Sequence, residues 1–144
     1  MTVVEITKIF NSHLLIIFMN EAVLKINKIV SELSEILDVS AIFIFGSRAT
    51  GKARKDSDYD LAVLTKNSSE ETDLEIMSYG DEMIDISLFS RLPLIIQFNV
   101  LKEGKLIYCR DKKEIYDLKV KILRSYLDFS SFMKRFYTRL INNV

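Results

Sequence analysis

Residues 41–64 read AIFIFGSRATGKARKDSDYDLAVL, and this stretch decides how the chain folds. The pattern predicts an apolar strand over 41–45, a turn at Gly46 and Ser47, a cationic loop, and a second strand that opens on Asp58 and Asp60. Side chains two residues apart on a strand lie on one face, so both carboxylates point to the same side. Carboxylates this close repel each other unless a cation binds between them. Mg²⁺ prefers such oxygen ligands and leaves room for phosphate.

The Gly-Ser turn is the second half of this pattern. Gly46 allows the backbone to bend sharply after the strand. Ser47 stands where a following helix would begin, and helix N-termini offer N–H groups to phosphate. Arg48 adjoins the turn, and three further cations follow in the loop: Lys52, Arg54 and Lys55. Such charges suit a solvated loop, but beside a metal they would also attract a nucleoside triphosphate and neutralise the leaving pyrophosphate.

A third carboxylate lies in residues 83–89, MIDISLF, which predict another strand. Ile84 and Ile86 share its apolar face, and Asp85 points the other way. An aspartate within an apolar strand is costly unless it is paired or bound to a metal. An edge strand that turns Asp85 toward water is the alternative.

In a chain with 20 acidic residues, an Asp-x-Asp pair alone is more typical of a solvated turn. The combination of an apolar strand, Gly-Ser, ten residues and Asp-x-Asp on a second strand resembles the signature of the polymerase-β-type nucleotidyltransferase superfamily. More narrowly, residues 46–64, GSRATGKARKDSDYDLAVL, resemble the minimal, MntA-like nucleotidyltransferase antitoxins of HEPN/MNT toxin–antitoxin pairs. The resemblance covers roughly residues 19–142.

The resemblance implies a complete catalytic site. Asp58 and Asp60, with Asp85 as the third carboxylate, would be the catalytic residues and would bind two Mg²⁺ ions. The nucleotide would be held by Gly46, Ser47 and Arg48. The family uses ATP as donor and a tyrosine of a HEPN-domain ribonuclease toxin as acceptor, so that transfer of AMP silences the toxin. Two alternatives stay open: an antitoxin that inhibits by binding alone, and a nucleotidyltransferase that acts on a small molecule such as an antibiotic.

Composition sets the remaining bounds. The 144 residues fit one domain, and 49% hydrophobic residues exclude a disordered chain. Basic and acidic residues both total 20, so net charge does not favour nucleic acid or a membrane as a partner. Cys109 and His13 are single, which argues against zinc sites and suits a reducing cytoplasm. We expect residues 1–18 to be an N-terminal extension, either helical or translated ahead of a start at Met19, and residues 19–144 to form the nucleotidyltransferase domain.

The expected fold is α/β: a small mixed sheet with the three aspartates on one face and helices against the other face and along the ends. The strand order comes from the family resemblance. Apolar spacing predicts helices over 20–38, 92–101 and 111–142, a short helix that Ser69 or Thr72 would cap, and a last strand over 105–108.

The long last helix carries an aromatic stripe that is too extensive for a small sheet to cover. We expect Met133 and Tyr137 to lie beside the main stripe and to stay exposed. Aromatic, methionine and arginine side chains are enriched in protein interfaces, and Arg135 and Arg139 flank the stripe. The helix end is therefore expected to help hold the HEPN partner, in a hetero-oligomer. Core packing or a homodimer is the alternative.

Overall fold

The structure, a computed structural model, describes residues 15–54 and 57–143. The expected extension over 1–18 thus lies largely outside the described residues. The helices are α2 (Leu15–Glu35), α3 (Ser47–Thr50), α4 (Glu70–Ser78), α5 (Leu94–Glu103) and α6 (Lys112–Asn142), with a 3₁₀ turn η1 (Phe89–Arg91). The strands are β1 (Val39–Phe45), β2 (Tyr59–Thr65), β3 (Ile84–Leu88) and β4 (Lys105–Cys109).

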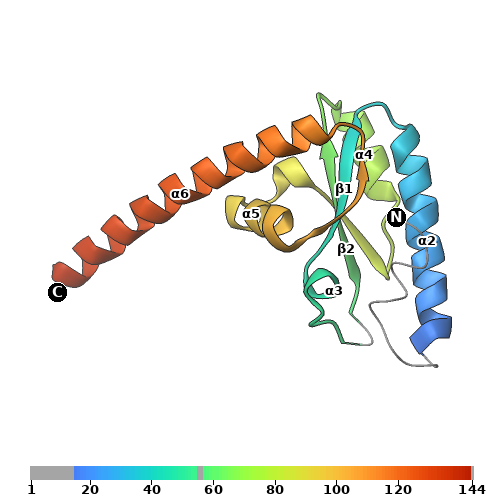
Figure 1. The fold of residues 1–144 in the computed structure, drawn as a ribbon, viewed down its shortest axis with the longest axis horizontal. Helices are drawn as coiled ribbons and strands as arrows, with labels where there is room; N and C mark the ends of the chain where they lie inside the picture. Colours follow the sequence, from blue (N-terminus) through green and yellow to red (C-terminus); the bar gives the residue numbers. More distant parts are fainter. Residues whose placement is uncertain (1–14, 55–56, 144) are drawn as a thin grey trace.

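The strands form one four-stranded mixed sheet in the order β3-β2-β1-β4. Strand β1 runs antiparallel to both β2 and β4, whereas β2 and β3 are parallel. Helix α4 makes the crossover that a parallel pair requires. The predicted α/β class and mixed sheet are therefore confirmed (Figure 1).

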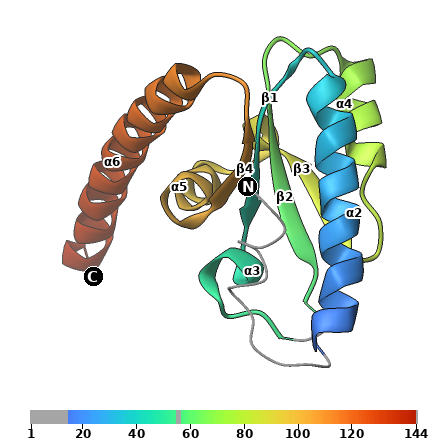
Figure 2. The same cartoon turned by 45° about the vertical axis from the view of Figure 1, so that its right-hand side comes forward.

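Helices cover both faces of the sheet. Helices α2 and α4 pack on one face, where Leu33 and Ile76 lie against Leu61 and Ile84. Helices α5 and α6 pack on the other face, where Val100 and Ile122 join a second cluster (Figure 2). Because side chains alternate along β2, this second face is the one that also carries Asp60.

The expectation that helices avoid the aspartate face is therefore wrong. Beyond Asp60, the same face continues with Ala62 and Leu64, which are apolar and must be buried. Helix α5 and the first half of α6 cover that end of the face. The aspartates stay accessible at the other end, where β2 and β3 begin.

Side chains fix where several helices begin. Ser69 caps α4 by accepting a hydrogen bond from the Thr72 N–H at 3.1 Å, as predicted, and Asp111 caps α6 by accepting from Lys113 N–H at 2.9 Å. Pro93 lies just before α5, and Gly104 follows its end. Residues of α5 and Gly46 line one cavity, so α5 lies near the Gly46 end of β1.

Helix α6 runs past α5 and away from the sheet (Figure 1). Its first half is buried through Ile115 and Ile122, whereas Phe129, Phe132 and Phe136 are exposed. Tyr137 is exposed as expected. Met133 is half-buried, so the prediction that it stays exposed is wrong. Within the described residues, no helix is both long and apolar enough to span a membrane.

Candidate active site

The three predicted carboxylates come together at the start of two parallel strands. Asp58 immediately precedes β2, Asp60 is the second residue of β2, and Asp85 is the second residue of β3. Asp60 and Asp85 are direct partners in the parallel register, so their side chains emerge side by side on one face. Asp60 is half-buried, whereas Asp58 and Asp85 are exposed.

The surroundings of Asp60 disfavour its negative charge. Burial raises the pKa of the Asp60 carboxyl, and the negative charges of Asp85 and Asp58 raise it further. Among the described residues, no arginine or lysine offsets this rise in the pKa of Asp60. A site that concentrates negative charge in this way favours a bound cation.

Gly46 is fitted against this cluster. Its backbone angles, φ 72° and ψ −151°, lie in a region that only glycine adopts readily. A Cβ atom placed on Gly46 would lie 2.5 Å from Asp60 Oδ2, which is closer than atoms can approach. An alanine at this position would have to displace the Asp60 carboxylate as well as adopt a strained backbone conformation, so the turn lies directly beside that carboxylate.

The predicted phosphate cradle is a single helical turn. Helix α3 spans only Ser47–Thr50, and the Gly46 carbonyl accepts hydrogen bonds from the N–H groups of Ala49 and Thr50. Ser47 is the first residue of this turn and follows Gly46. It therefore lies just beyond the end of β1, where Phe45 pairs with Asp60 of β2.

Arg48 links this turn to the start of β2. Its Nε and Nη2 atoms donate to the Ser57 carbonyl at 3.0 and 2.6 Å, and its guanidinium lies 4.6 Å from the centre of the Tyr59 ring. Ser57 and Tyr59 are the residues on either side of Asp58. The structure therefore gives Arg48 a role that the sequence did not reveal: it ties the turn to the segment that carries the aspartates. Lys55, one of the predicted loop cations, lies outside the described residues.

The donor set fits a hard divalent cation, since all three side chains offer carboxylate oxygens. Among the described residues, however, no three His, Cys, Asp or Glu side chains are already arranged closely enough to enclose a metal ion. The residues fit Mg²⁺ by their chemistry and shared face.

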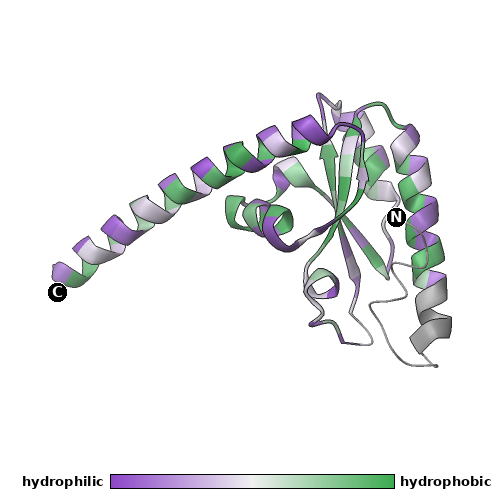
Figure 3. Cartoon of the chain, in the orientation of Figure 1, coloured by the Kyte–Doolittle hydropathy of each residue, from purple (hydrophilic) through white to green (hydrophobic). Residues whose placement is uncertain are grey.

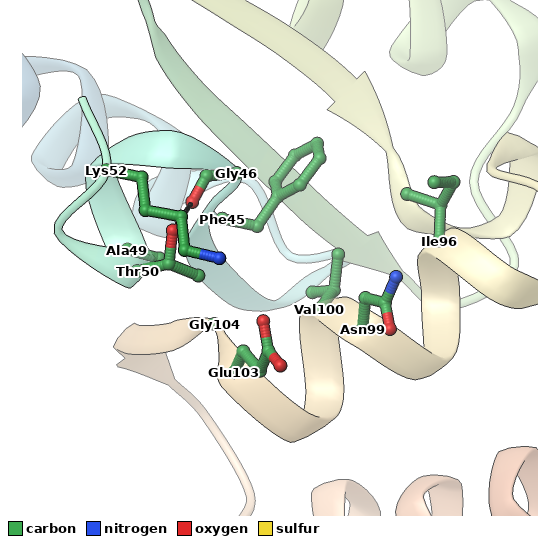
Figure 4. A pocket seen from close by; sticks show the side chains of 10 residues that line it. All are labelled: Phe45, Gly46, Ala49, Thr50, Lys52, Ile96, Asn99, Val100, Glu103 and Gly104. Carbon is green, nitrogen blue, oxygen red and sulfur yellow. Dashed lines mark hydrogen bonds between the residues drawn. The ribbon is translucent and has the colours of Figure 1, made fainter. Parts of the chain in front are cut away.

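A cavity of about 330 Å³ opens beside Gly46 (Figure 4). From the β1–α3 side it is lined by Phe45, Gly46, Ala49, Thr50 and Lys52, and from the α5 side by Ile96, Asn99, Val100, Glu103 and Gly104. Phe45 is the antiparallel partner of Asp60, so the cavity adjoins the carboxylates across β1.

Sequence reasoning missed Asn99 and Glu103 as site residues. They lie four residues apart, so they share one side of α5. That spacing was the available signal, but nothing local indicates that α5 ends against the Gly46 turn. Of the predicted loop cations, Lys52 reaches this cavity.

Comparison with known proteins identifies the family. The model of the family described as "Polymerase beta, Nucleotidyltransferase" matches residues 25–113, which include the Gly-Ser turn and all three aspartates. No curated protein matches the chain in sequence at a significant level.

Solved structures share the fold at low sequence identity. A crystal structure of a toxin-antitoxin with AMP-PNP contains a chain that is 20% identical, with a TM-score of 0.63, over 81% of this chain and 96% of that one. A tri-AMPylated Shewanella oneidensis HEPN toxin in complex with MNT antitoxin gives 20% identity and a TM-score of 0.60, over 82% and 97%. A nucleotidyltransferase described as putative, from Sulfolobus solfataricus, gives 20% and 0.52, over 71% and 93%.

The family match spans more than half of the chain, and the fold agrees with it. The chain belongs to the polymerase β nucleotidyltransferase family.

Proposed function

We propose that this protein transfers AMP from ATP to a tyrosine of a HEPN-domain ribonuclease toxin and thereby acts as the antitoxin. The observation that carries the proposal is the meeting of Asp58, Asp60 and Asp85 beside the Gly46 turn in a chain of this family. The fold it shares with chains of toxin-antitoxin complexes, one of them with an AMPylated HEPN toxin, supports this choice of acceptor.

In the proposed reaction, the tyrosine oxygen attacks the α-phosphorus of ATP. The new bond joins that oxygen to the α-phosphorus, the bond to the bridging oxygen of the β-phosphate breaks, and pyrophosphate leaves. We assign to Asp85 the acceptance of the proton of the entering hydroxyl, because it is exposed on the strand beside Asp60. The attacking group is then more nucleophilic as the bond forms.

Mg²⁺ would be held by Asp58, Asp60 and Asp85, and its positive charge would relieve the repulsion that Asp58 and Asp85 exert on Asp60. When bound, Mg²⁺ supplies charge stabilisation for both the entering and the leaving oxygens. Ser47 at the start of the turn would bind the triphosphate. Arg48 would orient Asp58 through Ser57 and add positive charge near the leaving group.

The cavity beside Gly46 is the place where we propose that the nucleoside of ATP lies. Its volume of about 330 Å³ falls at the lower end of the usual range for ligand sites. Asn99 offers a hydrogen-bond donor and an acceptor, and Glu103 offers acceptors. Lys52 adds a positive charge on the opposite wall. Asn99→Leu should therefore reduce the preference for ATP over other nucleoside triphosphates more than it reduces transfer of AMP at saturating ATP.

The test requires a neighbouring gene that encodes a HEPN-domain protein, and it uses this protein co-expressed and purified together with that HEPN chain. With Mg²⁺, label from the α-phosphate of ATP should move to the HEPN chain, whereas label from the γ-phosphate should not. Replacing the acceptor tyrosine by phenylalanine should abolish labelling. ATP with Mg²⁺ should also raise the Tm of the isolated protein, because a ligand bound only by the folded state stabilises it.

The same assay separates the alternatives. If Asp58→Asn with Asp60→Asn neutralises the toxin as well as the wild type does, inhibition works by binding alone. If the α-label moves to an aminoglycoside but never to the HEPN chain, the acceptor is a small molecule.

A further inference from the structure

The second half of α6 repeats the spacing with which its first half binds the domain. From Ile122 onward, apolar residues recur at alternating intervals of four and three: Ile122, Tyr126, Phe129, Met133, Phe136 and Leu140. This is the spacing of the a and d positions in a coiled coil, in which a straight seam on one helix packs against a second helix. We call Phe129, Met133, Phe136 and Leu140 the α6 seam.

The apolar stripe of α6 is covered by the rest of the domain only along the first half of the helix. Ile122 is 7% exposed, and the Tyr126 ring stacks on Phe98 of α5 with ring centres 3.9 Å apart. Beyond this point α6 extends past α5, and Phe136 and Leu140 are 46% and 50% exposed. Figure 3 shows hydrophobic colour continuing along this projecting part of the helix. The stripe is therefore continuous, whereas the surface that covers it ends at α5.

The part of α6 that projects beyond α5 has few internal interactions that would keep it helical in isolation. Residues 127–142 span roughly 24 Å as a helix, and isolated helices of this length are marginal in water. Several of its residues are poor helix formers, among them Ser130, Ser131 and Thr138. Phe132 and Phe136 stack on each other but leave the seam open on one side. A second helix against the seam would bury these rings and stabilise the turns that carry them.

Charge decides what kind of helix fits. Between residues 129 and 142 the chain has three basic side chains, Lys134, Arg135 and Arg139, and no acidic one. A second copy of α6 would bring like charges together in either a parallel or an antiparallel pair, which opposes association. An acidic helix would be attracted instead.

We propose that the α6 seam is the docking surface for an amphipathic helix of the protein acceptor, whose own apolar seam is flanked by Asp and Glu. This inference rests on the proposed function for the existence of an acceptor protein and adds the surface and the chemistry by which the acceptor is held. The seam continues the side of α6 that packs on α5 through Tyr126, and α5 covers the sheet face that carries Asp60. Figure 1 shows α6 projecting beyond α5.

The experiment measures binding of the co-expressed HEPN-domain protein to seam variants. Phe129→Ser with Phe136→Ser should weaken the complex by at least ~100-fold, because central aromatic residues dominate interface affinity. Ser131→Gln with Thr138→Gln, on the opposite side of the helix, is the matched control and should leave affinity unchanged. Both variants should keep the wild-type Tm and its rise with ATP and Mg²⁺, which shows that the domain is folded and its nucleotide site intact.

Two further readouts are specific to a helix seam. Amide hydrogen exchange over residues 129–142 should slow strongly when the partner binds and should stay fast in the Phe129→Ser, Phe136→Ser protein. Lys134→Glu with Arg139→Glu should weaken association about 10-fold and reverse its dependence on salt.

Unchanged binding by the two-phenylalanine variant overturns the proposal. So does a wild-type dimer that this variant dissolves, which would make the seam a contact between copies, or binding of single-stranded RNA that this variant loses. Failure of the catalytic proposal gives a different result: the wild-type complex forms through the seam, but no α-label is transferred.

Discussion

Asp60 and Asp81 stand near the starts of the two parallel strands, yet they are in opposite electrostatic states. The Asp60 carboxyl is half-buried beside two other carboxyls, and its pKa is raised. Asp81 forms an ion pair with Lys25 of α2 and accepts hydrogen bonds from the N–H groups of Met83 at 2.8 Å and Ile84 at 3.1 Å. These contacts hold its pKa below the usual value.

The difference separates a functional carboxylate from a structural one. The surroundings of Asp81 already satisfy its charge, so it stabilises the turn that leads into β3. The surroundings of Asp60 leave its charge unsatisfied, which destabilises the folded protein until something positive binds. Each of the following changes tests this contrast, starting with the largest expected effect.

The largest effect is expected from Asp60→Asn. Transfer of AMP should fall by at least roughly 10²–10³-fold, the scale of losing one preorganised electrostatic group. Free energy of unfolding in metal-free buffer should hold or rise, because the substitution removes a charge from a repelling cluster. Urea denaturation and the α-label assay measure the two quantities, with Asp58→Asn expected to behave alike. Transfer at the wild-type rate would show that these aspartates are not the metal site.

Gly46→Ala should follow. The added methyl would displace the Asp60 carboxylate and force a backbone conformation that costs about 1–3 kcal/mol, and a small displacement of a catalytic group can lower the rate by ~10²-fold. Gly51→Ala is the matched control, since Gly51 also has positive φ, 73°, but has no atom within 4 Å of an added Cβ. The control should lose some stability and keep the transfer rate. Equal rates for the two variants would mean that Gly46 does not position Asp60.

Asp81→Ala should reverse the pattern seen at Asp60. Loss of two hydrogen bonds from backbone N–H groups should lower the free energy of unfolding by about 1 kcal/mol, while transfer per folded molecule changes little. Lys25→Met, which keeps those hydrogen bonds, should have a smaller effect. A collapse of transfer with normal stability would place Asp81 in the catalytic machinery instead.

The smallest effect is in the dependence of stability on pH. A lowered pKa means that Asp81 stabilises the fold above its unfolded pKa, near 3.8, and that this contribution is lost as the pH falls through the folded value. A raised pKa means that ionised Asp60 destabilises the fold, and that this penalty disappears as the pH falls through its folded value. Denaturation from neutral pH to about pH 3 should therefore show the loss from Asp81→Asn and the gain from Asp60→Asn both shrinking toward zero. A difference that grew toward acid pH in either variant would contradict the assigned direction.

Much of this site could be predicted from sequence because its signals are local. The two-residue period predicts a shared face for Asp58 and Asp60, although β2 begins only at Tyr59. The apolar run on either side of Asp85 predicts a strand, which the structure confirms as β3. The cap of α4 was predicted as Ser69 or Thr72 from the local sequence, and the structure shows that it is Ser69. The pairing of Asp60 with Asp85 came from the family resemblance, and the register confirms it.

The features that sequence missed depend on contacts between distant segments. Whether α5 covers the aspartate face depends on how the sheet buries Ala62 and Leu64, which no short pattern encodes. Asn99 and Glu103 meet the Gly46 turn only after that packing forms. Met133 is a different case, because its spacing of four residues from Phe129 and seven from Tyr126 already puts it on their side of α6.

The bond from Arg48 to the Ser57 carbonyl has a consequence for how this protein can change. It connects the turn after β1 directly to the residue before Asp58, so the intervening loop does not have to set the distance between them. Insertions or deletions after Lys52, which leave α3 and the cavity lining unchanged, should be tolerated by the catalytic geometry as long as Arg48 and Ser57 remain. The loop is thus a place where new acceptor contacts can evolve, or be engineered, without rebuilding the aspartate cluster.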